Sequence, residues 1–306
     1  MKRTSILLLA LWILLTGCAA PKPSTQTQAK KKEEPMPIAI ETVRTDAFSM
    51  DYFRFGTGKR TLVILPGLSV QSVMGSAQAV AEAYAPLAEA FTVYLFDRRK
   101  ELPPVYSVAD MAADTAAAFQ KLGLEKVSLF GASQGGMIAQ QIAVDHPELV
   151  EKLVLGSTCA AVDEARFEVI GSWVRLARAK DREGLYLSFG EALYPRDVFE
   201  ASRDLLRQMA QAVTEEELAR FVILAEGTLG FDAEDRLENI ACPVLVLGAA
   251  DDRVLGPDAA NALAEKLGGK PGFQLYMYDG YGHAAFDTAP DYKARMLQFL
   301  TADSAA

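Results

Sequence analysis

Short apolar runs recur along the chain from residue 38 onward, and each is the length of one strand. Most are apolar at nearly every position, which is typical of strands covered on both faces in a parallel sheet. These runs are residues 61–65, 91–96, 127–130, 153–155, 244–247 and 273–278. Two extended stretches, 38–43 and 51–55, come before them and predict an antiparallel hairpin at the sheet edge.

Helical patterns fill the gaps between these predicted strands. Ser107 can cap a helix whose apolar side carries Met111 and Phe119. Further helices are predicted over residues 73–89, 134–146, 258–267 and 290–300. Strands that alternate with helices predict an α/β fold with a doubly wound, mostly parallel eight-stranded sheet.

One connection is too long for a simple crossover helix. The residues between Cys159 and Cys242 read as helix throughout, and Thr214 and Glu217 have capping-box spacing. An all-helical insertion of this kind is expected to cap the carboxyl edge of the sheet, where parallel sheets bind ligands. We therefore expect three folded parts, namely a first core segment, a helical cap and a second core segment, over residues 38–158, 159–241 and 242–306.

The start of the chain has the pattern of an export signal. A basic start precedes an apolar run over residues 6–15 that is short for a membrane span. Residues 15–18, LTGC, resemble a bacterial lipobox, in which a peptidase cuts before a cysteine that carries lipid such as palmitate. The alternative is an ordinary signal peptide with an incidental cysteine. We expect residues 1–17 to be a lipoprotein signal peptide and Cys18 to be the lipidated residue.

The next segment supports export. Residues 18–37 are rich in Pro, Ser, Thr and Gln and contain a KKKEE run, so they cannot bury enough apolar surface to fold. They are predicted to be a disordered tether. The protein is therefore expected to be exported and held at a bacterial cell membrane through its N-terminal lipid.

Composition narrows the chemistry of the folded part. The chain has 306 residues, of which 50% are hydrophobic and 23% charged, with a net charge of −9. A nucleic-acid partner that needs a basic face is therefore not expected. Cys159 and Cys242 should lie at opposite ends of the sheet, as buried free thiols. Only two histidines are present, His146 and His283, and His146 precedes a proline at a predicted helix end, where an exposed structural role is expected.

A candidate nucleophile lies between a predicted strand and a predicted helix. Residues 131–135, GASQG, match the G-x-S-x-G pattern in the strand–turn–helix context that it requires. The pattern needs glycine on both sides because side chains there would collide when the serine is held on a strained turn. The alternatives are a plain glycine-rich turn or a phosphate loop, and the lysine of a Walker loop is absent. Ser133 is the predicted nucleophile.

The acid and the base are predicted in two later turns. Asp251 and Asp252 follow the strand at 244–247. The distance in sequence from Gly248 favours Asp251 as the acid, whereas the aspartate-x-apolar spacing to Val254 favours Asp252. We prefer Asp252 and keep Asp251 as the alternative acid. His283 follows the last predicted strand in a glycine-flanked turn, where it can serve as the base.

The order serine, acid, histidine, with the elbow and the cap insertion, resembles the α/β-hydrolase family over nearly all of residues 38–302. The resemblance implies that the histidine takes the serine proton and that the aspartate orients the imidazole. The sequence around Ser133 and residues 146–148 is similar to enol-lactone hydrolases and haloperoxidase-like esterases. Serine as nucleophile argues against haloalkane dehalogenases and epoxide hydrolases, which use aspartate.

An oxyanion hole is also expected. Residues 65–69, LPGLS, follow a predicted strand at a position where relatives often have His-Gly, and proline here replaces the histidine. The backbone N–H groups of Leu68 and Gln134 are the expected donors to a tetrahedral oxyanion. The alternative is a Pro-Gly turn that only ends the strand.

These features predict a serine hydrolase that cleaves a small carboxylic ester, lactone or thioester through an acyl-enzyme. An acyltransferase with the same triad is one alternative, and an inactive surface-binding lipoprotein is another. No metal cluster, dinucleotide fingerprint or phosphate loop is present in the sequence, so no cofactor and no metal are expected, and the partner is a small acyl substrate. Arg98 or Arg99 could bind an anionic substrate, although a solvated loop is the plainer interpretation.

Overall fold

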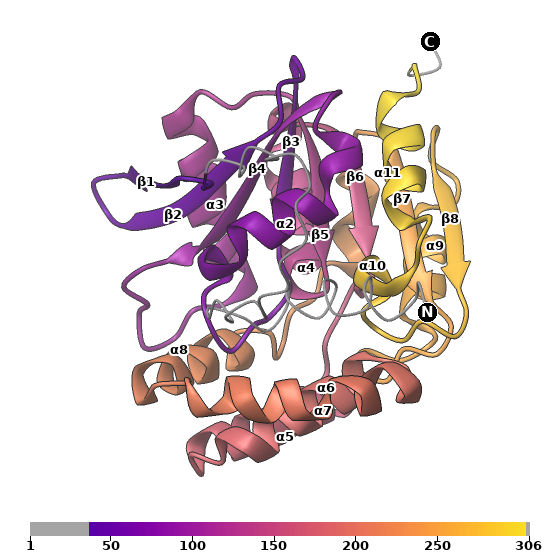
Figure 1. The fold of residues 1–306 in the computed structure, drawn as a ribbon. Helices are drawn as coiled ribbons and strands as arrows, with labels where there is room; N and C mark the ends of the chain where they lie inside the picture. Colours follow the sequence, from indigo (N-terminus) through magenta and orange to yellow (C-terminus); the bar gives the residue numbers. More distant parts are fainter. Residues whose placement is uncertain (1–36, 304–306) are drawn as a thin grey trace, which may run out of the picture.

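The computed structural model describes residues 37–303, which form a sheet flanked by helices (Figure 1). The order of the strands in the sheet is β1-β2-β4-β3-β5-β6-β7-β8, with β2 antiparallel to both of its neighbours and the remaining pairs parallel. The strands are β1 Ile40–Arg44, β2 Ser49–Phe55, β3 Arg60–Leu65, β4 Phe91–Arg99, β5 Val127–Ala132, β6 Val150–Gly156, β7 Val244–Ala249 and β8 Gln274–Tyr278. The predicted α/β fold with a mostly parallel eight-stranded sheet is confirmed.

Burial along the strands follows their position in the sheet. Every residue of β5 and β7 is buried, because helices cover both faces of the sheet there. By contrast, Leu275 and Tyr276 of β8 are exposed despite their apolar side chains. β8 is the last strand of the sheet, so a mostly apolar run did not mean complete burial at this edge.

Helices connect the parallel strands. They are α2 Ala77–Ala83, α3 Val108–Leu122, α4 Gln134–Asp145 and α9 Ala259–Leu267, while α10 Ala285–Thr288 and α11 Tyr292–Thr301 follow the last strand. Ser107 caps α3 with a capping box, as predicted. The prediction of one helix over 73–89 was wrong, since short 3₁₀ turns flank α2 on both sides. Pro86 explains the later break, because proline lacks an N–H and disfavours helical geometry in the preceding residue.

Four helices lie between β6 and β7 in the chain. They are α5 Glu164–Arg178, α6 Arg182–Leu193, α7 Arg196–Gln211 and α8 Glu215–Glu226. Thr214 begins α8 with the capping box expected from its spacing to Glu217. Figure 1 shows the four helices as a layer on the side to which the arrows of β6 and β8 point, the carboxyl edge of the sheet. We refer to α5–α8 as the cap helices.

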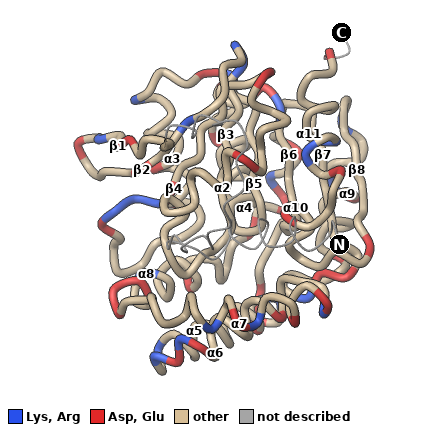
Figure 2. The backbone as a smooth tube through the Cα atoms, in the orientation of Figure 1, with Lys and Arg blue, Asp and Glu red and all other residues tan. Residues whose placement is uncertain are grey.

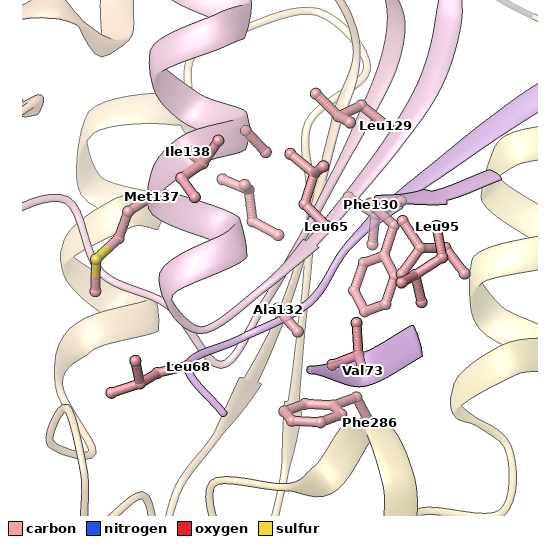
Figure 3. Close-up of a cluster of buried hydrophobic side chains, with 14 of the residues drawn as sticks. Leu65, Leu68, Val73, Leu95, Leu129, Phe130, Ala132, Met137, Ile138 and Phe286 are labelled. Carbon is pink, nitrogen blue, oxygen red and sulfur yellow. The ribbon is translucent and has the colours of Figure 1, made fainter. Parts of the chain in front are cut away.

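The buried core supports the turn between β5 and α4. Figure 3 shows Leu65 of β3, Phe130 of β5 and Ile138 of α4 in one cluster, with Leu68 and Phe286 at the end next to Ala132. All of these side chains are buried. Because close-packed interiors deform little, this cluster provides a rigid support for whatever the β5–α4 turn carries.

Cys159 and Cys242 are unpaired, as predicted, although Cys242 is only partly buried. Among residues 37–303, no helix combines the length and the apolar character needed to cross a membrane. The signal peptide, Cys18 and the tether expected over residues 1–17 and 18–37 lie almost entirely outside the described residues.

Candidate active site

Ser133 lies in a strained turn between β5 and α4. Its backbone dihedrals, φ 52° and ψ −123°, are unusual for a residue with a side chain and cost about 1–3 kcal/mol. Two hydrogen bonds hold the turn, one from the Ser133 N–H to the Gly156 carbonyl (2.8 Å) and one from the Thr158 hydroxyl to the Ser133 carbonyl (2.8 Å). The surrounding structure therefore stabilises a conformation that the chain would not adopt alone.

The two glycines of the G-x-S-x-G pattern are required by close backbone approach. A Cβ atom added to Gly131 would lie 2.2 Å from the carbonyl oxygen of Gly135. A Cβ atom added to Gly135 would lie 2.0 Å from the carbonyl oxygen of Leu65. Both distances are far inside van der Waals contact with backbone that cannot move aside. The pattern in the sequence therefore has a direct steric cause in the fold.

His283 and Asp252 form a buried pair. The distance from His283 Nδ1 to Asp252 Oδ2 is 2.8 Å, and the His283 side chain is almost entirely buried. The other carboxylate oxygen, Oδ1, accepts the N–H groups of Val254 and Leu255. Burial acts to raise the pKa of Asp252, but the His283 imidazole and these N–H donors together hold that pKa below its ordinary value. Asp252 is therefore a carboxylate at neutral pH, and it favours the tautomer with the proton on Nδ1, which leaves Nε2 free to accept a proton.

Asp251, the alternative acid, occupies a different position. Both of its carboxylate oxygens accept the N–H of Gly282 at 3.1 Å, directly before His283 in the chain. Asp252 and not Asp251 contacts the imidazole, while Asp251 ties down the loop that carries the imidazole. Two adjacent carboxylates thus hold the same loop at two points.

Ser133 and His283 line the same pocket. Its apolar walls come from the cap helices and from the core, and they are formed by Ile170, Trp173, Phe189, Leu193, Met137, Val254 and Phe286. Within the described part of the chain, no lysine, arginine, aspartate or glutamate side chain lines it. The pocket suits a compact apolar group that carries no charge.

The two expected oxyanion donors border the same pocket. Leu68 and Gln134 both line it, as does Gly67 between Pro66 and Leu68. A Cβ atom added to Gly67 would lie 3.1 Å from Ser133 Cβ, so this loop runs directly beside the serine. Among residues 37–303, neither the Leu68 N–H nor the Gln134 N–H has a hydrogen-bond acceptor. Two such N–H groups beside a serine can stabilise negative charge on a substrate oxygen.

The remaining candidate residues lie away from the pocket. His146 is the residue that caps the end of α4, and its Nδ1 lies 3.5 Å from Oε1 of Glu148. It is half-buried, whereas the sequence predicted an exposed position. The Arg99 guanidinium contacts Asp114 and the Ala47 carbonyl. Arg98 is buried behind the pocket and does not line it.

Neither the cap residues of the pocket wall nor Thr228, which also lines it, could be identified from the sequence. These residues reach the site from segments that carry no recognisable motif. Thr158, which holds the carbonyl of Ser133, was missed for the same reason. Only the periodic apolar pattern of the cap helices could have indicated that some of these side chains face the core.

A buried carboxylate lies close to His283 in the chain. Asp287 is in α10, and both of its carboxylate oxygens are buried, with Lys293 and the Tyr194 hydroxyl nearby. Burial raises the pKa of Asp287 to about 7, and the nearby Lys293 only partly opposes this shift. This carboxyl group is therefore expected to titrate near neutral pH in the folded protein.

We expect this burial to make the folded protein less stable at high pH. The pKa of Asp287 in the folded protein exceeds the ordinary value of 3.8, so the folded protein binds this proton more tightly than the unfolded chain does. The stabilisation from this proton is complete below about pH 4 and is lost as pH rises through 7. The loss is about 4 kcal/mol at most. Asp287→Asn should remove this loss, measured as the free energy of unfolding in urea at pH 5 and pH 8. Asp204→Asn, at an exposed carboxylate, is the control. If the free energy of unfolding of Asp287→Asn changed between pH 5 and pH 8 as much as that of the wild type, Asp287 would not be the group responsible.

Comparison with known proteins agrees with this architecture. The family model for the alpha/beta hydrolase fold matches residues 60–290. A protein of Caulobacter segnis, named as a candidate carbamate hydrolase, RutD, is 30% identical over 243 residues, which are 75% of this chain and 87% of that relative. A protein of Caulobacter vibrioides with the same name is 29% identical over 242 residues, 75% of this chain and 86% of its own.

Solved structures show the same fold at lower identity. MGS-M2, an alpha/beta hydrolase enzyme from a deep-sea metagenome library, has a TM-score of 0.76 and 19% identity, covering 87% of this chain and 99% of its own. The enol-lactonase from Burkholderia xenovorans LB400 has a TM-score of 0.72 and 18% identity, and the match covers 86% of this chain and 100% of the enol-lactonase chain. The family match over most of the chain confirms the expected resemblance. This protein belongs to the alpha/beta hydrolase fold family and is a hydrolase.

Proposed function

We propose that this hydrolase cleaves a small, uncharged carboxylic ester, lactone or thioester through an acyl-enzyme on Ser133. The proposal rests on one arrangement: Ser133, on its strained turn, lines the same pocket as His283, which is hydrogen-bonded to the Asp252 carboxylate. A serine, a histidine with a free Nε2 and a buried carboxylate are the groups needed for nucleophilic acyl transfer.

In the proposed mechanism the histidine carries the serine proton to the leaving group in acylation, and a proton of water to the serine oxygen in deacylation. His283 Nε2 accepts the proton of the Ser133 hydroxyl as that oxygen attacks the substrate carbonyl. Asp252 stabilises the imidazolium that forms, and the N–H groups of Leu68 and Gln134 donate to the tetrahedral oxyanion. The imidazolium then protonates the leaving group, which departs and leaves the acyl-enzyme. Water, activated by the same imidazole, releases the acid.

The lining of the pocket supports the choice of substrate. Its walls are apolar and uncharged, so an anionic acyl group would lose its hydration without gaining a cation. Arg98, considered above for binding an anion, is directed to other acceptors. The Caulobacter relatives named for carbamate hydrolysis make an uncharged carbamate a second candidate, because its carbonyl can react in the same way. We also propose residues 159–241 as the cap that supplies one wall of the acyl site.

Acyl transfer to an alcohol or amine would use the same residues and differ only in the group that deacylates the serine. We favour hydrolysis because the family and the named relatives are hydrolases. Product analysis with added alcohol and amine would detect transfer. Transfer products in preference to the free acid would reverse our choice.

Fluorophosphonate labelling of the full-length protein tests the proposed nucleophile without a guess about the substrate. The wild type should be labelled, while Ser133→Ala and His283→Ala should not be. Wild-type protein that has not been treated with the probe should hydrolyse neutral short-chain esters faster than monoesters of dicarboxylic acids, which carry a charged carboxylate. A folded wild type that reacts neither with this probe nor with a smaller sulfonyl fluoride would contradict the proposal and favour a binding protein.

The location of the enzyme is a separate proposal that depends on the sequence alone. We propose that the chain is exported, cleaved before Cys18 and anchored to a bacterial membrane by lipid on Cys18, with residues 18–37 as a tether. Growth with radiolabelled palmitate should label the wild type and leave Cys18→Ser unlabelled. Equal labelling of both proteins would contradict lipidation at this residue.

A further inference from the structure

Arg98, near the end of β4, is a buried cation without a salt bridge among the described residues. The residue is 4% exposed, and burial lowers the pKa of the guanidinium to about 10, so it remains charged at neutral pH. Burying a charge without an ionic partner is costly unless hydrogen bonds compensate for the lost hydration. The acceptors of this guanidinium therefore indicate why it is buried here.

Both of its acceptors belong to segments that carry the expected oxyanion donors. Arg98 Nη2 donates to the carbonyl oxygen of Pro66 (2.8 Å) and to Oε1 of Gln134 (3.1 Å). Pro66 precedes Gly67 and Leu68, whose loop supplies one free N–H, while Gln134 supplies the other from its own backbone. One guanidinium nitrogen thus bridges the two sides of the oxyanion hole from outside the pocket.

The Gln134 side chain extends this connection to the cap helices. Its Nε2 donates to the Leu224 carbonyl of α8 (2.7 Å) and to the Thr228 hydroxyl just beyond α8 (2.9 Å). Arg220, also in α8, donates to the carbonyl oxygens of Arg99 (2.8 Å) and Arg98 (3.3 Å). Figure 2 shows the basic run that ends β4 above α8. The end of β4, the start of α4 and α8 are therefore joined through buried and partly buried hydrogen bonds.

We propose that Arg98 is a positioning residue that sets the separation of the Leu68 and Gln134 N–H groups and links them through Gln134 to α8. The inference depends on the proposed serine mechanism. Arg98 does not touch the substrate, since it acts through the Pro66 carbonyl and the Gln134 amide. Oxyanion donors contribute most when they are held in place before charge develops. Loosening this bridge should therefore reduce the stabilisation of the transition state more than it reduces the affinity for substrate.

The test compares Arg98→Met with Arg99→Met. Arg99 is the next residue on the same strand, but its guanidinium contacts Asp114 and the Ala47 carbonyl away from the pocket, so it controls for the loss of one charge. We expect Arg98→Met to lower kcat on a neutral ester about 10- to 100-fold with little change in KM, because loss of a whole oxyanion donor costs about 10²- to 10³-fold. Arg99→Met should retain wild-type kcat. Arg98→Lys, which keeps a donor, should recover part of the loss.

A second readout separates positioning from general stability. A trifluoromethyl ketone forms a tetrahedral adduct with an activated serine, whereas the corresponding amide binds as a planar carbonyl. Arg98→Met should weaken binding of the ketone by the same factor as kcat/KM and leave binding of the amide unchanged. If Arg98→Met does not fold, Gln134→Met provides the test, because it keeps the backbone N–H while removing the link to Arg98 and α8.

Two results would overturn the inference, and they can be told apart. Wild-type protein that binds the ketone, with undiminished ketone binding in Arg98→Met or Gln134→Met, would contradict the positioning role alone. Wild-type protein that neither reacts with fluorophosphonate nor binds the ketone would contradict the serine mechanism, and the role of Arg98 would fall with it.

Discussion

Replacing Ser133 by alanine is expected to lower kcat for a small neutral ester about 10⁶-fold, since loss of a serine nucleophile removes the acyl-enzyme route entirely. The fold should survive, because alanine keeps the Cβ atom and the hydrogen bonds of the turn involve only the main chain of residue 133. Hydrolysis of a chromogenic short-chain ester measures the rate, and thermal unfolding checks the fold.

The chain offers a matched control for this variant. Ser157 is also buried and also has a positive φ of 42°, but it does not line the pocket, and its hydroxyl has no partner among the described residues. Ser157→Ala should therefore keep wild-type activity. Residual activity of more than a few per cent in Ser133→Ala, or an equal loss in both variants, would show that Ser133 is not the nucleophile.

The sheet and the Ser133 turn could be predicted because each depends on local sequence. A strand buried on both faces must be apolar at successive positions, as β5 and β7 are. The Ser133 turn must have glycine where the Gly131 and Gly135 backbones approach their neighbours. In each case the constrained residues are close together in the chain and leave a readable pattern, even though the atom that excludes a side chain at Gly135 belongs to the distant Leu65.

Features that depend on distant contacts could not be predicted in this way. The sequence suggested an anion-binding or solvated Arg98, yet Arg98 is buried and donates to Pro66 and Gln134, which lie on other segments. Thr228 reaches the pocket from beyond α8, where no motif marks it. The wall of the acyl site is set by how the cap helices pack on the sheet, and an amphipathic pattern indicates a buried face without indicating what that face contacts.

The choice between Asp251 and Asp252 shows the same limit within one loop. Neighbouring aspartates have the same chemistry, and only the path of the backbone decides which one faces the histidine. Here the N–H groups of Val254 and Leu255 hold Asp252 from one side while His283 contacts it from the other. Asp251 instead meets the N–H of Gly282. This difference gives the two residues separable roles.

We therefore expect asparagine to have very different effects at the two positions. Asp252→Asn should lower kcat about 10⁴-fold at neutral pH, because the amide neither stabilises the imidazolium nor favours the Nδ1–H tautomer. Asp251→Asn should lower kcat less than about 10-fold, since the amide oxygen can still accept the Gly282 N–H and a neutral hydrogen bond contributes about 1 kcal/mol. The measurement is kcat for both variants on one ester, with thermal unfolding of each.

Three outcomes of this measurement lead to different conclusions about the loop. A large loss confined to Asp252→Asn would mean that the carboxylate against the imidazole acts electrostatically, while Asp251 contributes only to holding the loop. The reverse result would mean that the loop rearranges when substrate binds and brings Asp251 to His283 in place of Asp252. Equal large losses of kcat, with lowered thermal stability in Asp251→Asn alone, would mean that two contacts are equally necessary. One is the hydrogen bond from Gly282 to Asp251, which places His283, and the other is the contact of the imidazole with Asp252.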